Sequence, residues 1–248
     1  HKMAALLTRN QIEMVVHFSG NAYVGESMVY PEDYYQNITA STVSLVRAMN
    51  RAGVHRLIFS SSCATFGSPT TFPITETTPQ RPTNPYGQAK LQAEQAIVAF
   101  LQSRERQHAP FSAALLRYFN VVGADPRGRI GPHLIHKANA RFPRILDAVY
   151  DVALGVRKEL TVTGDSFATK DGSAQRDYIH VTDLVEVCIS LHLPVSPCIS
   201  LDLPRDRPRR GARHAARTLT LTLTLNPNPN PNPNPCPGAR HAAGRAQG

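Results

Sequence analysis

Three short apolar segments alternate with two amphipathic segments in the first half of this chain, and this alternation limits its possible folds. Each apolar run is three to five residues long, as expected of a short strand that is buried on both faces. The expected strands are Met14–Phe18, Arg56–Ser60 and Ser112–Tyr118, and the expected helices are 34–50 and 85–101. Strand and helix alternation predicts an α/β fold with a doubly wound parallel sheet.

The boundaries of these segments carry ordinary helix signals. Gly53 follows the first helical segment and ends it, Asn84 can cap the second, and Pro85 suits a first helical turn. In parallel sheets, ligands bind beyond the carboxyl ends of the strands. Polar segments follow all three expected strands, at 19–21, 60–62 and 119–120. We therefore expect a binding site where these segments meet.

Tyr86 and Lys90 lie four residues apart on the second expected helix, so they share one face. An ammonium beside a phenol stabilises the phenolate and lowers the tyrosine pKa, which makes Tyr86 a candidate general base. Ser62 follows the preceding strand, where its hydroxyl can contact the same substrate oxygen. One such pair also arises by chance in a chain with eight tyrosines. Its position in the strand and helix order is what strengthens the assignment.

Seven collinear segments give this chain a specific resemblance. They are HFSG (17–20), YVGES (23–27), YYQNI (34–38), FSSSCATFG (59–67), NPYGQAK (84–90), LRYFNV (116–121) and RDYIHV (176–181). In this order and spacing they resemble the extended short-chain dehydrogenase/reductases of the NAD-dependent epimerase/dehydratase type. Within that family the segments are most similar to UDP-glucose 4-epimerases and UDP-arabinose 4-epimerases.

The resemblance implies a role for each matching residue. Tyr86 would be the catalytic acid and base at the sugar 4-hydroxyl, Ser62 would hydrogen-bond the 4-oxygen, and Lys90 would bind the nicotinamide ribose. The residues that would line the NAD pocket with Tyr86 and Lys90 are Phe18, Gly20, Asn37 and Ser60. Asn120 and Arg176 would contact the substrate diphosphate, for which the fixed charge and planar fork of arginine are suited.

Two of these residues, and Cys63 in the same motifs, have simpler explanations. Asn37 can serve only to cap a turn, Arg176 can serve only to pair with Asp177, and Cys63 fits a small core position.

The mechanism that the resemblance implies is a transient oxidation. Tyr86 removes the 4-hydroxyl proton while NAD accepts the C4 hydride, and both return after the 4-keto sugar has turned its other face. NAD is therefore a tightly held cofactor, UDP-glucose and UDP-galactose are the first expected substrates, and UDP-xylose and UDP-arabinose are the alternative.

The last part of the chain, 194–248, differs sharply from the expected domain at 1–193. It holds half of the 20 prolines, a Thr-Leu repeat at 218–225 and an Asn-Pro repeat at 226–235. Proline breaks helices and ladders, so we expect a disordered tail. Both repeats are reading frames of one hexanucleotide repeat, ACCCTA, which points to translated repetitive DNA. The tail also carries 8 arginines and 2 aspartates, so it supplies +6 of the net charge of +9.

The amino-acid composition indicates the expected cellular location and partners. Most of the basic excess lies in the tail, which lacks the interleaved aromatic residues of a nucleic-acid-binding surface, so no nucleic-acid partner is expected. The sequence contains no run of eighteen apolar residues, so no membrane-spanning helix is expected. The four cysteines have no CxxC spacing, so we expect neither a metal site nor a disulfide framework, and the expected location is the cytoplasm. The family resemblance adds a homodimer as the expected assembly.

The resemblance also indicates that family segments are missing at both ends. The glycine-rich turn that binds the NAD pyrophosphate does not precede Met14, and the first expected helix, 2–10, corresponds to the third helix of the family. The expected fold is therefore an incomplete Rossmann-like sheet with part of a small substrate domain. Two hypotheses follow: an active epimerase whose sequence is truncated, or a truncated fragment without catalytic activity.

Overall fold

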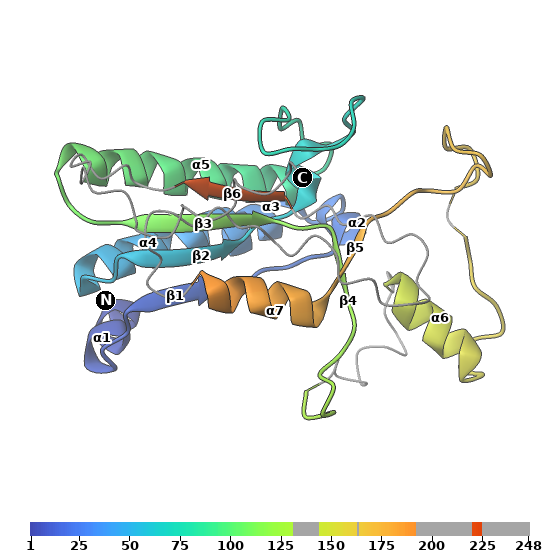
Figure 1. Cartoon of the computed structure of the whole chain (residues 1–248), viewed down its shortest axis with the longest axis horizontal. Coiled ribbons are helices and arrows are strands. Elements are labelled where there is room, and N and C mark those ends of the chain that lie inside the picture. The colour runs from blue at the N-terminus through green and yellow to red at the C-terminus, as the bar shows by residue number, and fades with distance from the viewer. Residues whose placement is uncertain (131–143, 163, 192–219, 225–248) are drawn as a thin grey trace, which may run out of the picture.

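Three parallel strands form the centre of the structure, a computed structural model that describes residues 1–130, 144–162, 164–191 and 220–224 (Figure 1). The strands are β1 (Met14–His17), β2 (Arg56–Ser60) and β3 (Ser112–Arg117), and they agree closely with the expected segments. In the sheet, β1 pairs with β2, which pairs with β3, both in parallel. The carboxyl ends of the three strands therefore lie at one edge, as predicted.

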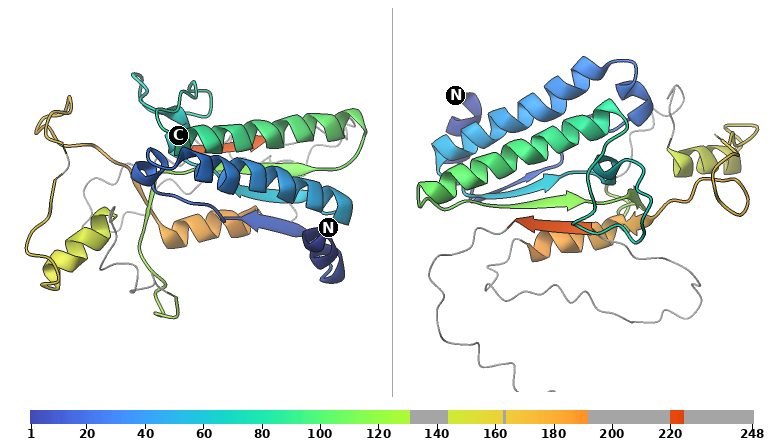
Figure 2. Two further views of the ribbon diagram at one scale, coloured as in Figure 1. Left: turned by 180° about the vertical axis from the view of Figure 1, so that it is seen from behind. Right: turned by 90° about the horizontal axis from the view of Figure 1, so that it is seen from above.

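Helices cover both faces of this sheet, so the predicted winding is confirmed (Figure 2). Helices α4 (Ser41–Ala52) and α5 (Pro85–Arg106) pack on one face, and α7 (Val181–Ser190) packs on the other. Leu57 and Phe59 of β2 join the first core, while Ile58 joins the second, which includes Leu184 of α7. Burial on alternate faces explains why the strand sequences are apolar throughout.

Helix α5 begins as its sequence predicts and runs five residues beyond the expected end. The Asn84 side chain accepts a hydrogen bond from the Gly87 N–H at 2.8 Å and caps the first turn. The expected helix 34–50 is instead three consecutive segments: α3 (Pro31–Tyr34), a π-helical segment η1 (Tyr35–Ala40) and α4. Gly53 ends α4 with φ 71°, as expected.

A second, two-stranded sheet lies beyond the carboxyl ends of the main strands. Its strands β4 (Asn120–Val122) and β5 (Tyr178–His180) are parallel. Helix α6 (Ile145–Ala153) lies on the same side of the molecule (Figure 1). These elements occupy the place of the expected substrate-domain portion. The remaining elements are α1 (Lys2–Arg9), α2 (Val24–Ser27) and the 3₁₀ turn η2 (Cys63–Phe66).

Five residues of the Thr-Leu repeat form a strand, β6 (Thr220–Thr224), which pairs antiparallel with β3. This strand lies inside the segment that was expected to be disordered. Its partner, β3, comes from outside the expected tail and offers an outer edge whose backbone N–H and C=O groups β6 pairs. The rest of the expected tail, 194–219 and 225–248, lies outside the described residues. Among the described helices, none has the length and apolar character to cross a membrane.

Candidate functional site

The segment Ser60–Ser62 and the side chains of Tyr86 and Lys90 meet at the carboxyl end of β2. All five residues are buried, and Lys90 is only 4% exposed. The Lys90 ammonium donates a hydrogen bond of 2.7 Å to the Ser60 carbonyl and lies 5.9 Å from the centre of the Tyr86 ring. The structure thus brings together the three residues that the sequence assigned to catalysis.

Close approach of two backbones brings Tyr86 to Ser62. Gly87, the residue after Tyr86, faces the backbone of Ala64 in η2, and a Cβ on Gly87 would lie 2.5 Å from the Ala64 carbonyl oxygen. The Ser62 hydroxyl accepts a hydrogen bond from the Ala64 N–H at 3.1 Å and caps η2. A residue without a side chain at 87 therefore lets the first turn of α5 contact the turn that holds Ser62.

The expectation that Lys90 lowers the Tyr86 pKa is not met in this structure. Burial raises the Tyr86 pKa above its ordinary value, while interaction with the Ser62 hydroxyl and the charge of Arg144 act in the opposite direction. The reason is desolvation, which disfavours the phenolate. Arg144 precedes α6 and was missed by the sequence analysis, because no motif near it marked a site.

Burial also governs the charge of Lys90. It lowers the Lys90 pKa to about 8, although the nearby Glu94 carboxylate acts to raise it. The His17 side chain, at the end of β1, has a lowered pKa because it is buried and faces the Lys90 charge. His17 shares a hydrogen bond with Thr42 at 3.3 Å. A neutral imidazole therefore lies on one side of Lys90 and a carboxylate on the other.

Two tyrosines that the sequence analysis did not assign support the site. The Tyr118 hydroxyl shares a hydrogen bond with the Ser60 hydroxyl, so the Ser60 side chain already has a partner. Tyr34 is fully buried and contacts the Tyr86 ring edge-on, with ring centres 6.2 Å apart. Its hydroxyl donates to the Tyr23 carbonyl at 2.8 Å. Both tyrosines lie inside the motifs that carried the resemblance. Their position beside assigned motif residues was the only sequence feature that could have marked them as part of the site.

The residues expected to bind NAD border this centre, and their arrangement fits a nicotinamide ribose. A Cβ on Gly20 would lie 3.7 Å from the Lys90 ammonium nitrogen and 3.8 Å from the Asn37 side-chain oxygen. Lys90 and Asn37 thus converge on an exposed backbone segment where they can meet hydroxyl groups. Phe18 is 51% exposed beside it. Asn37 also accepts a hydrogen bond from the Asn21 N–H at 2.7 Å, which gives it the turn-holding role considered above.

Asn120 and Arg176 lie together at the second sheet and face solvent. The Asn120 amide donates to the Asp177 carbonyl at 3.0 Å, which ties β4 to the residue after Arg176. The charge of Arg176 acts on Cys63, the neighbour of Ser62. The expected substrate-binding pair is therefore brought near Ser62 by the β4–β5 pairing.

The two cysteines in the described part of the chain, Cys63 and Cys188, show no sign of a catalytic role. Cys63 and Cys188 are free, and burial raises the pKa of both thiols. A raised pKa disfavours the reactive thiolate, in agreement with a packing role for Cys63. Over the ranges that the structure describes, no group of three His, Cys, Asp or Glu side chains is placed to hold a metal ion.

This fold, with a tyrosine, a lysine and a serine beyond a parallel strand, defines a Rossmann-like α/β protein of the dinucleotide-dependent kind. Residues 1–194 match the model of the NAD dependent epimerase/dehydratase family. The chain therefore belongs to that family.

Individual relatives agree with the family match. UDP-arabinose 4-epimerase 1 from Arabidopsis thaliana is 44% identical over 185 residues, which cover 73% of this chain and 42% of that protein. UDP-glucose 4-epimerase from Bacillus subtilis is 44% identical over 182 residues, which cover 73% of this chain and 51% of that protein.

A solved structure shows the same fold. It is the UDP-glucose-4-epimerase from Stenotrophomonas maltophila with bound NAD and formylated UDP-arabinopyranose, at a TM-score of 0.69 and 34% identity. The match covers 77% of this chain and 54% of that one. The chain thus spans about half the length of the relatives that it matches.

Proposed function

We propose that this chain carries the catalytic centre of an NAD-dependent UDP-sugar 4-epimerase. The observation that carries the proposal is the meeting of Ser62, Tyr86 and Lys90 in a buried site beyond the carboxyl end of β2. The named relatives are 4-epimerases of two UDP-sugar types, and one structural neighbour holds NAD with a UDP-sugar derivative. Both kinds of match support the same chemistry.

In the proposed mechanism, each residue handles one atom of the sugar. The Tyr86 phenolate oxygen accepts the proton of the 4-hydroxyl and later returns it, and the Ser62 hydroxyl hydrogen-bonds the same oxygen. Burial raises the Tyr86 pKa, and a charged Lys90 ammonium, 5.9 Å from the centre of the phenol ring, would act against this effect. NAD, when bound, supplies the acceptor for the C4 hydride. The exposed Arg176 pairs with the diphosphate, and Asn120 contacts it, so the sugar can turn about a fixed anchor.

A hybrid enzyme provides the test of this function. Residues 1–193 replace the matching segment in the Bacillus subtilis relative, which supplies the remaining length. We expect the purified hybrid to interconvert a UDP-sugar and its 4-epimer and to retain NAD. Absence of turnover in a hybrid that folds and binds NAD would contradict the proposal. The 248-residue chain, assayed alone in parallel, tests whether it is active or a fragment without catalytic activity.

We propose UDP-glucose and UDP-galactose as the first substrate pair, because that activity is the commoner one in the resembling family. The pentose pair, UDP-xylose and UDP-arabinose, is a second candidate. It is supported by the UDP-arabinose 4-epimerase from Arabidopsis thaliana, which is as similar to this chain, at 44% identity, as the Bacillus subtilis UDP-glucose 4-epimerase is. Discrimination of a single hydroxymethyl group is worth about 1–3 kcal/mol. We therefore expect the hybrid to turn over both pairs. A kcat/KM preference for the pentose pair above about tenfold would reverse the order.

We propose a cytoplasmic homodimer as the working form. Free thiols at Cys63 and Cys188 agree with a reducing compartment. Light scattering of the hybrid at several concentrations measures the assembly, and a constant monomer mass would contradict the dimer. Neither nucleic acid nor membrane is a proposed partner, and addition of either to the hybrid should leave turnover unchanged.

A further inference from the structure

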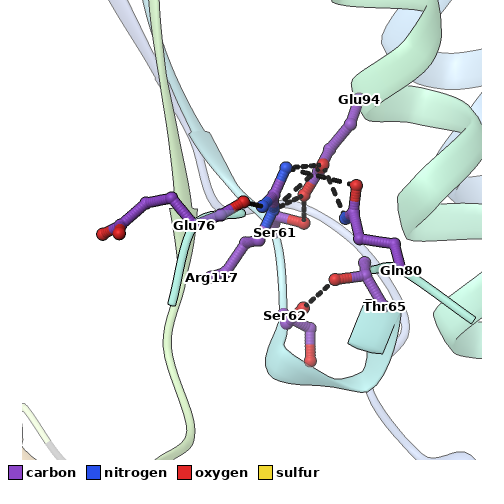
Figure 3. A network of polar contacts seen from close by, with 7 residues as sticks. All are labelled: Ser61, Ser62, Thr65, Glu76, Gln80, Glu94 and Arg117. Atoms are coloured by element: carbon purple, nitrogen blue, oxygen red, sulfur yellow. Dashed lines mark hydrogen bonds and ion pairs between the residues drawn. The ribbon is translucent and has the colours of Figure 1, made fainter. Parts of the chain in front are cut away.

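A buried cluster of polar side chains lies beside the Ser61–Ser62 segment, and the mechanism above does not use it (Figure 3). Three of its members, Ser61, Glu94 and Arg117, are 1%, 2% and 6% exposed. They come from the end of β2, the middle of α5 and the end of β3. A buried ion pair is weak grounds for stability, because desolvation offsets most of the attraction. The cluster therefore needs another explanation.

The cluster is centred on the Glu94 carboxylate. The Arg117 guanidinium donates to both carboxylate oxygens, at 3.0 Å and 3.1 Å from Nε and at 2.7 Å from Nη2. Gln80 adds a third donor at 3.0 Å, and the Ser61 hydroxyl adds a fourth. The guanidinium also lies over the Phe66 ring, 5.4 Å from its centre. Glu94 is thus held from several directions in one orientation.

Residues on two successive turns of α5 form hydrogen bonds with two successive residues of the segment that leads to Ser62. Lys90 holds the Ser60 carbonyl, and Glu94, one turn later, holds the Ser61 hydroxyl. Tyr86 lies one turn before Lys90 on the same helix face. A rotation or slide of α5 would break both contacts at once, and it would move Tyr86 away from Ser62.

We propose that Glu94, fixed by Arg117, is a positioning residue, whose hydrogen bond with Ser61 sets helix α5 against the Ser60–Ser62 segment and so places Tyr86 and Lys90. The catalytic consequence rests on the proposed function, whereas the placement itself does not. Glu94 and Arg117 touch neither substrate nor cofactor in this proposal; they act through Ser61 and the helix.

The pKa of the Lys90 side chain is a measurable quantity that depends on this placement. The ionisable groups that face it are Tyr86 and Glu94 on α5 and His17 on β1, with Arg117 behind Glu94. Burial lowers the Lys90 pKa to about 8 from 10.5. If α5 loosens, water reaches the ammonium and the pKa rises. If only the charge of Glu94 is lost, the pKa falls, so the two effects have opposite signs.

The first test removes one hydroxyl and leaves the ion pair intact. In the full 248-residue chain with ¹⁵N-labelled lysines, NMR follows the Lys90 ammonium signal against pH, with Lys90→Arg as the assignment variant. We expect Ser61→Ala to raise the Lys90 titration midpoint by about half a pH unit or more. An unchanged midpoint would overturn the proposal. Ser68→Ala, at an exposed serine in the loop after η2, is the matched control.

The second test separates placement from charge and from stability. The double variant Glu94→Met with Arg117→Met removes both charges, and such replacements often leave stability unchanged. We expect its Lys90 midpoint to rise, whereas a charge-only role predicts a fall, which would contradict the proposal. If the double variant does not fold, Ser61→Ala decides alone.

The last test measures the catalytic consequence in the hybrid enzyme. We expect Ser61→Ala to lower kcat about tenfold with little change in KM, since proton transfer depends on placement. A raised KM with unchanged kcat would overturn this part. If the unsubstituted hybrid shows no turnover, the proposed function fails, but the NMR titration in the chain still decides whether Glu94 and Ser61 position α5.

Discussion

The two sides of the site are built in different ways. On one side, Ser62, Tyr86 and Lys90 are buried, and contacts with β2, η2 and neighbouring side chains hold them. On the other side, most of the residues expected to bind NAD and the diphosphate lie open to solvent, although Ser60, which was also expected to line the NAD pocket, is buried. The exposed residues are Phe18, Gly20, Asn37, Asn120 and Arg176. The protein therefore holds the proposed catalytic groups in place before any ligand arrives.

This difference predicts different consequences of substitution. A buried residue that is held by several contacts affects both the rate and the free energy of unfolding, because its neighbours lose partners when it changes. An exposed residue contributes little to stability, so its loss should appear only in ligand binding. Each prediction below tests whether a residue belongs to the side where the structure places it.

Removal of the Tyr86 hydroxyl should have the largest effect. In the hybrid enzyme, Tyr86→Phe keeps the ring and its edge contact with Tyr34 but loses the atom that moves the proton. We expect turnover to fall by about 10²–10⁴-fold with NAD retained, and Tm to fall as well because the buried Ser62 hydroxyl loses a hydrogen-bond partner. Chromatography of the two UDP-sugars measures this. Tyr30→Phe, at an exposed tyrosine, is the control, and equal activity of both variants would contradict the assignment.

Substitution of Arg176 should come next and should leave stability unaffected. We expect Arg176→Gln to raise KM for the UDP-sugar by about 10–100-fold, since hydrogen bonds to charged groups contribute about 1.5–3 kcal/mol. Unfolding of the variant should match that of the unsubstituted enzyme because the side chain is exposed. Arg51→Gln, at an exposed position on α4, serves as the control. An unchanged KM would support the simpler surface role instead.

The sequence predicted the main sheet well and the outer elements poorly. The bounds of β1, β2 and β3 follow from apolar runs, and the start of α5 follows from Asn84 and Pro85, because burial and capping are local signals. The π-helical segment η1 and the β4–β5 pair have no such signal. Their geometry depends on tertiary contacts that a single sequence does not encode in its periodicity.

The candidate site shows the same division. The convergence of Ser62, Tyr86 and Lys90 follows from strand and helix order, and the structure agrees. The direction of the Tyr86 pKa was wrong, because desolvation depends on the depth of burial and outweighs a neighbouring charge. Support from Arg117 was also missed, since its partner Glu94 lies 23 positions away along the chain.

The charge of Lys90 should make stability depend on pH above neutrality. With a folded pKa of about 8 and an ordinary value of 10.5, the ammonium destabilises the fold fully below pH 8. Between pH 8 and 10.5 the unfolded chain binds the extra proton, so stability rises with pH. Relative to Lys90→Met, the unsubstituted chain should gain on the order of 3 kcal/mol over this range. Urea unfolding at several pH values measures the difference, and a constant difference would contradict the lowered pKa.

The smallest expected effect, at Gly87, tests the close contact between α5 and η2. Replacement of glycine by alanine inside a helix ordinarily stabilises it, by about 1 kcal/mol. At Gly87 the added Cβ would meet the Ala64 carbonyl oxygen at 2.5 Å, so one backbone has to move. We expect Gly87→Ala to lower Tm by about 2–8 °C, as overpacking costs about 1–3 kcal/mol. The displaced turn should also carry Tyr86 away from Ser62, and the hybrid should then lose kcat.

The control lies on the same helix. Ala99 is exposed on α5, and Ala99→Gly should lower Tm because glycine has a lower helix propensity than alanine. Glycine should therefore be the better residue at 87 and the worse one at 99, although both positions are helical. A Gly87→Ala variant with raised Tm and unchanged kcat would show that α5 and η2 are not in close contact, and that the buried side of the site is less tightly held than the structure indicates.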